Sequence, residues 1–146
     1  MKTKQRKQRL GKQRGAAAVE FALIAAVFFS VLIGIMEMGR VLFYMNTATE
    51  ATRLGARVAV VCDINDPAIK SKMQGMLSIL NTTNINITYP TVACGTGTCE
   101  TVKVEITGLT VNTFIPLIPF SITMPTFSTT LPIESLSSAN NSLCDG

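Results

Sequence analysis

Histidine and tryptophan are both absent from this sequence of 146 residues. Without histidine, the chain lacks the most frequent general base of hydrolases and a common metal ligand. The sequence also contains no nucleophile elbow, no phosphate-binding glycine loop and no cluster of acidic residues. We therefore expect a protein that is not an enzyme and has no cofactor, no metal ion and no small-molecule substrate.

Charge is nearly absent from residues 16–36, where Glu20 is the only charged side chain. A helix of this length spans about 31 Å, close to the thickness of the hydrocarbon core of a bilayer. A buried core helix of a soluble protein is the alternative, but such helices are rarely this apolar with basic residues on one flank. The pattern predicts a transmembrane helix over residues 16–39.

Acidic residues are absent from the first 14 positions, which hold seven of the 13 basic residues. The remainder has six basic and nine acidic residues, so the net charge of +4 comes from the N-terminal tail. A basic tail can bind nucleic acid, but beside an apolar helix it is explained by the orientation of a membrane span. We expect a cytoplasmic N-terminus, residues beyond about 40 outside, and no nucleic-acid partner.

A signal-peptidase site of the A-x-A kind is also missing after the apolar run, where Glu37-Met38-Gly39-Arg40 follows. A secretory signal needs a shorter apolar stretch and such a site. The helix is therefore expected to stay in the mature protein as an anchor.

Four features that are present occur together in the first third of the chain. They are an R-G-x-A-x-V-E-F start at Arg14, the apolar run, an E-x-G-R turn at Glu37, and the element ATRLGAR from Ala51 to Arg57. With these features, the chain from Arg14 to about Val61 resembles the TadE-like pseudopilins of the tight-adherence (Flp) pilus system. Family members often carry a proline midway along the apolar run. Here Ala25 and Ala26 stand in that region, so we expect a straighter helix.

The resemblance implies that a prepilin peptidase cuts after Gly15, with Ala16, Glu20 and Phe21 in the recognised site, so that residues 1–15 are a cleaved leader. It also implies a single-pass protein of the bacterial inner membrane whose C-terminal part is periplasmic or extracellular. The implied partners are the lipid bilayer, the peptidase, other pilin or pseudopilin subunits, and inner-membrane pilus assembly proteins. Because Gly15 has no side chain, an extended backbone there can approach a protease closely.

Glu20 is the one costly residue of the span, because a charged carboxylate in the hydrocarbon costs a few kcal/mol at mid-bilayer and less near the interface. In pilins of this general type, such a glutamate is thought to meet the free amine of a neighbouring subunit. An opposite charge within about 4 Å is strong enough to offset the burial. The alternative is that Glu20 only reaches back to the headgroups. We assign Glu20 an assembly role.

Past Arg40, apolar and small residues continue at helical spacing, which predicts an amphipathic extension over residues 40–62 and one helix from about 16 to 61. Glu50 and Arg53 are three residues apart on the polar side and can pair. The apolar side packs on the protein's own head or against another subunit, and we favour the former. Its members are Val41, Met45, Ala48, Thr52, Gly55, Ala59 and Cys62.

Residues 63–146 are expected to form an external α+β head with one helix and a few antiparallel strands. Asp66-Pro67 is typical of a helix start, and the apolar stripe that follows reaches about Asn81. Alternation predicts strands over 85–89 and 100–107, with weaker candidates over 109–114 and 126–131 and a bend at Gly108. The apolar, proline-broken stretch 114–120 either fills the core, lies on the bilayer or meets another subunit. We favour the core.

The four cysteines indicate an oxidising compartment. A glycine-bearing loop separates Cys94 from Cys99, so this pair can close on itself, which leaves Cys62 to pair with Cys144. Four cysteines allow three pairings, and a zinc site is the rival interpretation. The spacing is unusual for zinc and an oxidising compartment disfavours free thiolates, so we predict the disulfides Cys94–Cys99 and Cys62–Cys144.

The function that we expect is that of a minor pseudopilin needed for assembly of a Flp-type pilus. The alternative is a membrane-tethered periplasmic binding or adhesin module that never enters a filament, which would need neither Gly15 nor an acid five residues on. Major Flp pilins are little more than the helix, and TadG-like proteins are much longer. A TadF-like relative remains open.

Overall fold

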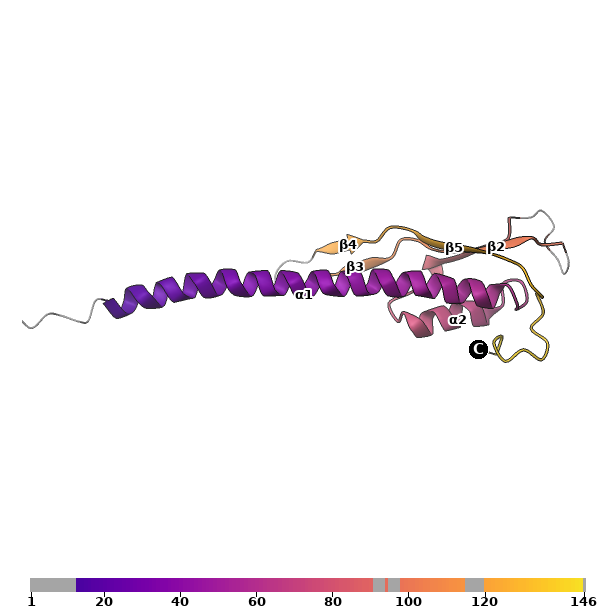
Figure 1. The fold of residues 1–146 in the computed structure, drawn as a ribbon, viewed down its shortest axis with the longest axis horizontal. Coiled ribbons are helices and arrows are strands. Elements are labelled where there is room, and N and C mark those ends of the chain that lie inside the picture. Colours follow the sequence, from indigo (N-terminus) through magenta and orange to yellow (C-terminus); the bar gives the residue numbers. More distant parts are fainter. Residues whose placement is uncertain (1–12, 91–93, 95–97, 115–119, 146) are drawn as a thin grey trace, which may run out of the picture. The chain divides into compact units, whose positions relative to one another are not determined.

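The computed structural model describes residues 13–90, 94, 98–114 and 120–145. They form an α+β protein with a long N-terminal helix and a small head of one short helix and antiparallel strands, which confirms the predicted fold class (Figure 1). The chain divides into two compact units between Met38 and Gly39, and the long helix runs through both. The elements are α1 (Gln13–Ala59), α2 (Pro67–Met76), the 3-10 helix η1 (Thr82–Asn84), β1 (Ile85–Thr88), β2 (Thr101–Ile106), β3 (Thr110–Asn112), β4 (Ser121–Thr123) and β5 (Phe127–Pro132).

Helix α1 is one unbroken element of 47 residues. No proline interrupts it, and Ala25 and Ala26 are helix formers at the place where the related proteins often have proline. The prediction of one helix over residues 16–61 is confirmed, with a start at Gln13 and an end at Ala59.

Helix α2 begins as predicted and ends earlier. The side chain of Asp66 accepts a hydrogen bond from the backbone N–H of Ala68 at 2.9 Å, and Pro67 occupies the first turn. The prediction that this helix reaches Asn81 is wrong, because Leu77 adopts an extended conformation with φ −130° and ψ 92°. Leu77 and Leu80 are still buried, so the core keeps its apolar side chains without a continuous helix.

Strand β2 is the centre of a three-stranded antiparallel sheet in the order β1-β2-β5. Its side chains alternate as predicted: Val102, Val104 and Ile106 are fully buried, whereas Lys103 and Glu105 lie on the other face and form an ion pair at 3.0 Å. Strand β5 is an edge strand that ends at Pro132, where a missing N–H does least harm to a sheet.

A second, two-stranded antiparallel sheet is formed by β3 and β4. Gly108 makes the bend before it with φ +64°, in the left-handed region that glycine adopts most readily. All four strand predictions are confirmed in position. The chain passes from β2 of the first sheet into β3 of the second, and returns from β4 to β5 of the first sheet.

The core of the head consists of side chains from α1, α2 and the inner face of the three-stranded sheet. The expected apolar side of α1 is buried here, with Met45 partly buried, so it packs on the protein's own head. Thr52 is the one buried polar side chain among the described residues, and its hydroxyl bonds to Thr49 O at 2.8 Å and Thr129 Oγ1 at 3.0 Å. This second bond connects α1 to β5.

At Gly55, α1 closely approaches both α2 and β2. A Cβ atom at Gly55 would lie 2.4 Å from Met73 Sδ, 2.9 Å from Met73 Cγ and 3.2 Å from Val104 Cγ1. The first two distances are below van der Waals contact, so the packing requires the absence of a side chain. This explains the glycine of the ATRLGAR element as a contact residue of the head.

The segment after β5 covers the end of α1. Val60 O accepts hydrogen bonds from the backbone N–H groups of Glu134, Ser135 and Leu136 at 3.1, 3.2 and 3.5 Å, and Val61 O accepts one from Ser137 at 2.9 Å. Carbonyl groups at the end of a helix have no partner within the helix and must find one elsewhere. The C-terminal segment supplies these partners.

Disulfide bonds join the cysteines in the two pairs that loop lengths had predicted. The Cα atoms of Cys62 and Cys144 are 5.7 Å apart, and those of Cys94 and Cys99 are 4.9 Å apart. Both distances lie in the usual range for a disulfide. The first bond links the end of α1 to the C-terminal segment.

Replacing Gly55 with alanine should destabilise the head. The added methyl group overpacks the contact with Met73 and Val104, which typically costs about 1–3 kcal/mol, and the better helix propensity of alanine recovers at most about 1 kcal/mol. Gly75→Ala is the matched control, because a Cβ atom there meets nothing within 4 Å. Pulse proteolysis of the full chain in detergent micelles, across a urea series, measures the urea concentration at the midpoint of unfolding. This midpoint should be lower for Gly55→Ala and not for Gly75→Ala. Equal midpoints for both variants would contradict the proposed close contact.

The two disulfides should differ in their contribution to stability. In the chain-entropy model, closing the long loop from Cys62 to Cys144 stabilises by about 4.5 kcal/mol, and closing the short loop from Cys94 to Cys99 by about 2 kcal/mol. The double variant Cys62→Ser, Cys144→Ser should therefore lose more protease resistance than Cys94→Ser, Cys99→Ser. Non-reducing peptide mapping of the wild type checks the pairing, and a peptide linking Cys62 to Cys94 or Cys99 would show it to be wrong.

Candidate membrane anchor and assembly site

The predicted cleavage position lies in the first turn of α1. The helix begins at Gln13, so the bond between Gly15 and Ala16 is helical, whereas the sequence predicted a helix that starts after it. Both residues are exposed. The first four N–H groups of a helix lack partners within it, and glycine is about 1 kcal/mol less favourable than alanine in a helix. Unwinding this turn for a protease is therefore inexpensive.

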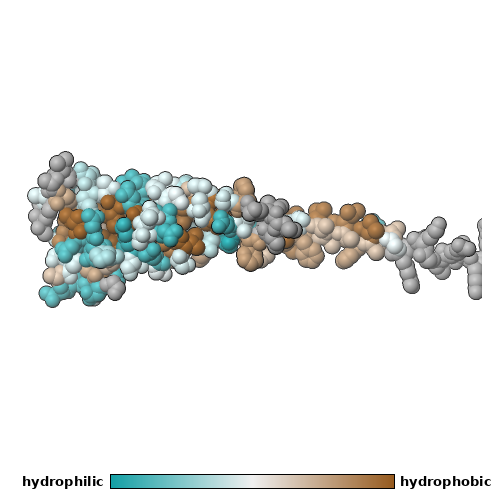
Figure 2. All heavy atoms as spheres, turned by 180° about the vertical axis from the view of Figure 1, so that it is seen from behind, coloured by the Kyte–Doolittle hydropathy of each residue, from teal (hydrophilic) through white to brown (hydrophobic). Residues whose placement is uncertain are grey.

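The helix after Ala16 exposes an apolar surface on all sides. An 18-residue window within Gly15–Ala59 is apolar enough to cross a membrane, and none of that window is buried. In the view of Figure 2, hydrophobic residues cover the described N-terminal part of α1, whereas hydrophilic residues are spread over the head. A core helix of a soluble protein would be covered by its own chain. The large exposed apolar side chains include Val19, Phe21, Leu23, Ile24, Val27, Phe28, Phe29, Val31, Ile33, Ile35 and Met36.

Glu20 is exposed on this apolar surface, together with Phe21. Among the described residues, no hydrogen bond or ion pair reaches the Glu20 carboxylate, whereas Ser30, the other polar side chain between residues 16 and 36, donates to Ala26 O at 2.7 Å. A hydroxyl bonded within its own helix is tolerated in lipid. The Glu20 carboxylate is thus the group of the span that needs a partner from outside this helix.

Arg40 makes a contact that its place in the sequence did not reveal. The sequence places this residue at the end of the E-x-G-R element, just after the apolar run. In the structure its Nη2 donates a hydrogen bond to the backbone oxygen of Asn112 in β3. Arg40, Tyr44 and Ile79 line a small surface pocket together with residues of β3, namely Thr110, Val111 and Asn112. No local pattern in the sequence pairs position 40 with position 112.

The polar side of α1 is exposed as predicted. Arg53 Nη1 and Glu50 Oε1 form the expected ion pair at 2.7 Å, and both side chains are more than half exposed. Such exposed pairs contribute only a few tenths of a kcal/mol. The pair therefore keeps this side of the helix polar and contributes little to the stability of the fold.

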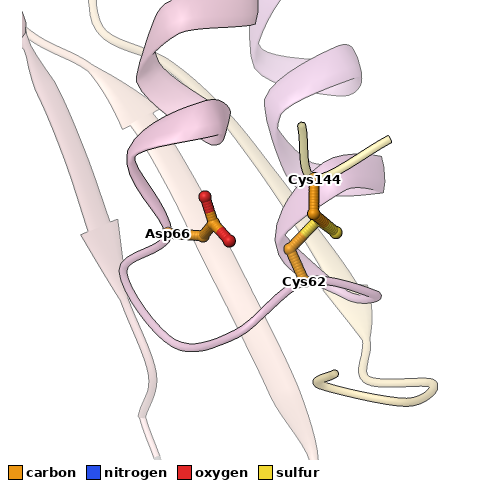
Figure 3. A group of neighbouring side chains, drawn as sticks. All are labelled: Cys62, Asp66 and Cys144. Atoms are coloured by element: carbon orange, nitrogen blue, oxygen red, sulfur yellow. A yellow bond between two sulfur atoms is a disulfide. The ribbon is translucent and has the colours of Figure 1, made fainter. Parts of the chain in front are cut away.

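Cys62, Asp66 and Cys144 bring three potential metal-ligand atoms within 4.8 Å of one another (Figure 3). The two sulfur atoms are bonded to each other, so neither is the thiolate that zinc binds. The carboxylate of Asp66 is also engaged, because Oδ1 accepts from Ala68 N–H and Oδ2 from the hydroxyl of Ser138. These three side chains are therefore better explained as a structural link between the start of α2 and the C-terminal segment than as a zinc site. The expectation that no metal binds stays a prediction.

Tyr89 lies beside this link, and its surroundings shift its acid–base equilibrium. Partial burial raises the pKa of the Tyr89 hydroxyl above its ordinary value, and the nearby Asp66 carboxylate acts in the same direction. A backbone hydrogen bond from Asn65 N–H to the Tyr89 oxygen, at 3.4 Å, opposes both effects. The hydroxyl therefore stays neutral at physiological pH and has a structural role.

The first and last residues of the stretch 114–120 do not lie in the core. Phe114 is 85% exposed and Phe120 is 60% exposed, so the expectation that this stretch fills the core is wrong for both. Residues 115–119 lie outside the described part of the chain.

Comparison with known proteins identifies a family for part of the chain. Residues 15–57 match the family model described as TadE-like protein. No curated protein and no solved structure matches the chain. The matched segment begins at the glycine of the predicted cleavage position and ends at the last residue of the ATRLGAR element, and it contains both the apolar surface and Glu20. The chain thus carries a TadE-like domain at residues 15–57, as expected of a TadE-like protein of the tight-adherence pilus system.

Proposed function

We propose that this protein is a membrane-anchored minor pseudopilin that is needed for assembly of a Flp-type pilus. The observation that carries the proposal is Glu20: an acid with no partner among the described residues, on an otherwise apolar, exposed stretch of helix, inside the TadE-like segment and five residues after Gly15. A simple anchor gains nothing from this acid, because a charge in the hydrocarbon weakens insertion. An assembling helix can use it to recognise a neighbour.

Maturation supplies the complementary charge. A prepilin peptidase that cuts after Gly15 on the cytoplasmic side releases a positively charged amine at Ala16. In a bundle of such helices, the Glu20 carboxylate of one subunit then pairs with the amine of another, in surroundings where charges attract strongly. The partners in this proposal are the peptidase, other pilin or pseudopilin subunits, and inner-membrane assembly proteins.

The orientation follows from the charges around the span. The basic N-terminal tail remains in the cytoplasm, and the span of residues 16–39 crosses the inner membrane once. The extension of residues 40–62 and the head of residues 63–146 then lie on the periplasmic or extracellular side, where disulfides persist. The protein binds no small-molecule substrate and catalyses no reaction in this proposal.

Cleavage after Gly15 is the first expectation. Mass spectrometry of the protein from membranes with an active prepilin peptidase should find Ala16 as the N-terminus, and a strain without the peptidase should retain Met1. Gly15→Ala should slow the cut and Gly15→Val should block it, because the protease needs close access to the backbone. An intact Met1 in the presence of the active peptidase would contradict the proposed maturation.

Glu20→Gln tests the assembly role, since it removes the charge and keeps nearly the same shape. We expect normal insertion and normal protein levels in the membrane, with pilus formation and adherence lost or strongly reduced. Ser30→Ala is the matched control, because it removes the other polar group of the apolar run 16–36 and should leave the pilus intact. Membrane fractionation and electron microscopy of surface filaments measure the two outcomes.

The result for Glu20→Gln also separates this proposal from a tethered binding module. Full pilus formation by the Gln variant would reject the assembly role and favour an anchor whose glutamate only reaches the headgroups. Loss of the protein from the membrane would mean that Glu20 acts in insertion, which also contradicts the proposal.

A further inference from the structure

Two exposed phenylalanines stand at the end of the β3–β4 hairpin. The hairpin pairs Asn112 with Ser121, and beyond this pair Thr113 N–H donates to Phe120 O at 2.8 Å while Phe120 N–H donates to Thr113 Oγ1 at 3.3 Å. Phe114 follows directly. Exposure of large aromatic side chains to water is unfavourable, so their exposure at one hairpin end points to an interaction surface.

The two sheets place this hairpin along α1. Val104 of β2 lies against Gly55, and Thr129, the β5 residue paired with Val104, bonds to Thr52. Further along the chain, Asn112 of β3 accepts the hydrogen bond from Arg40. From β2 to β3 the chain therefore runs back along α1, from residue 55 to residue 40. Phe114 follows this last contact by two residues in the chain, and β3 and β4 are the strands drawn nearest to it in Figure 1.

Arg40 lies close to the end of the expected membrane span. The uncharged run ends at Met36, so Arg40 is about one helical turn, or about 6 Å, further along α1. The headgroup layer on each side of the hydrocarbon core has a similar thickness, about 5–7 Å. Arginine and tyrosine are typical of this layer, which suits Arg40 and Tyr44.

Charge is absent from the whole region around the hairpin. No charged residue occurs between Glu105 and Glu134, although these 28 residues include β3, β4 and β5. A hairpin without charges can enter the headgroup layer without removing an ionised group from water. On α1, Leu42 and Phe43 are also exposed, at 52% and 63%, so the apolar surface continues past Arg40 on the helix itself.

From this geometry we propose that the β3–β4 hairpin is a second membrane contact of the protein. Phe114 and Phe120 insert into the headgroup layer of the leaflet from which α1 emerges. The inference rests on the membrane anchoring in the proposed function. With the helix and the hairpin both in contact with lipid, the head has a defined orientation above the bilayer, which a single tether cannot provide.

The absence of tryptophan allows a direct test, because each substitution creates a single fluorescent reporter. Three full-length variants are compared: Phe114→Trp at the hairpin, Phe28→Trp within the span, and Leu143→Trp in the C-terminal segment, where the native leucine is 53% exposed. Each is reconstituted in vesicles of phosphatidylcholine and phosphatidylglycerol, with and without bromine atoms on the acyl chains. Phe120→Trp is a second hairpin reporter in case Phe114→Trp fails to fold, as judged by protease resistance.

The expected result is quenching at the hairpin by bromines near the headgroup. The reporter at position 114 should lose about half of its fluorescence with bromines placed high on the chains and less with bromines near the bilayer centre. The reporter at position 28 should show the reverse order, and the reporter at position 143 should be unquenched with an emission maximum at longer wavelength.

Three other results would overturn the inference, and they differ in what they leave standing. An unquenched, long-wavelength emission at position 114, with position 28 quenched, places the hairpin in water and leaves the anchor intact. A short-wavelength but unquenched emission at position 114 places the hairpin against protein, such as a second subunit. An unquenched reporter at position 28 rejects the membrane anchor and the hairpin contact together.

Discussion

The close contact of α1 with α2 and β2 at Gly55 is the constraint on which the head depends. Three elements meet there at a separation that leaves no room for a Cβ atom. The residues of α1 near Gly55 are also small and fully buried, so the helix can pack closely against the rest of the head along this stretch. They are Ala48, Ala51, Ala56 and Ala59. Most of the large side chains of the core come from the partners, such as Met73 of α2 and Ile106 of β2, and α1 adds Val58. Close packing of this kind tolerates little change in volume.

A single helix therefore serves two different environments. Up to about Met36 its surface is apolar on all sides and exposed, as a bilayer requires. From Val41 onward one apolar side packs against the head, and Leu42 and Phe43 are still exposed on the rest of the helix. Both patterns lie on one helical element, Gln13–Ala59.

The end of α1 is held by parts of the chain that are far away in sequence. The carbonyl groups of Val60 and Val61 receive hydrogen bonds from the C-terminal segment, and the disulfide between Cys62 and Cys144 joins the same two regions covalently. Ser138 adds a bond to Asp66, the residue that caps α2. The ends of both helices are thus satisfied by one segment, which explains why a stretch without regular secondary structure holds a fixed path.

The sequence by itself determined the features that depend on local pattern. A continuous apolar run identified the span, alternation and helical spacing identified four of the five strands and the buried side of α1, and Asp66-Pro67 identified the start of α2. Each of these signals is contained in a few neighbouring residues, whereas β4 was not predicted. Loop lengths were enough to predict the cysteine pairs. Tertiary contacts alone decided the end of α2 at Met76, the bond from Arg40 to Asn112 and the exposed positions of Phe114 and Phe120. For the bond from Arg40, the deciding partner is distant in sequence. For the two phenylalanines, an apolar side chain suits a protein core and a lipid surface equally well. Only the packed structure shows whether such a side chain is buried or exposed.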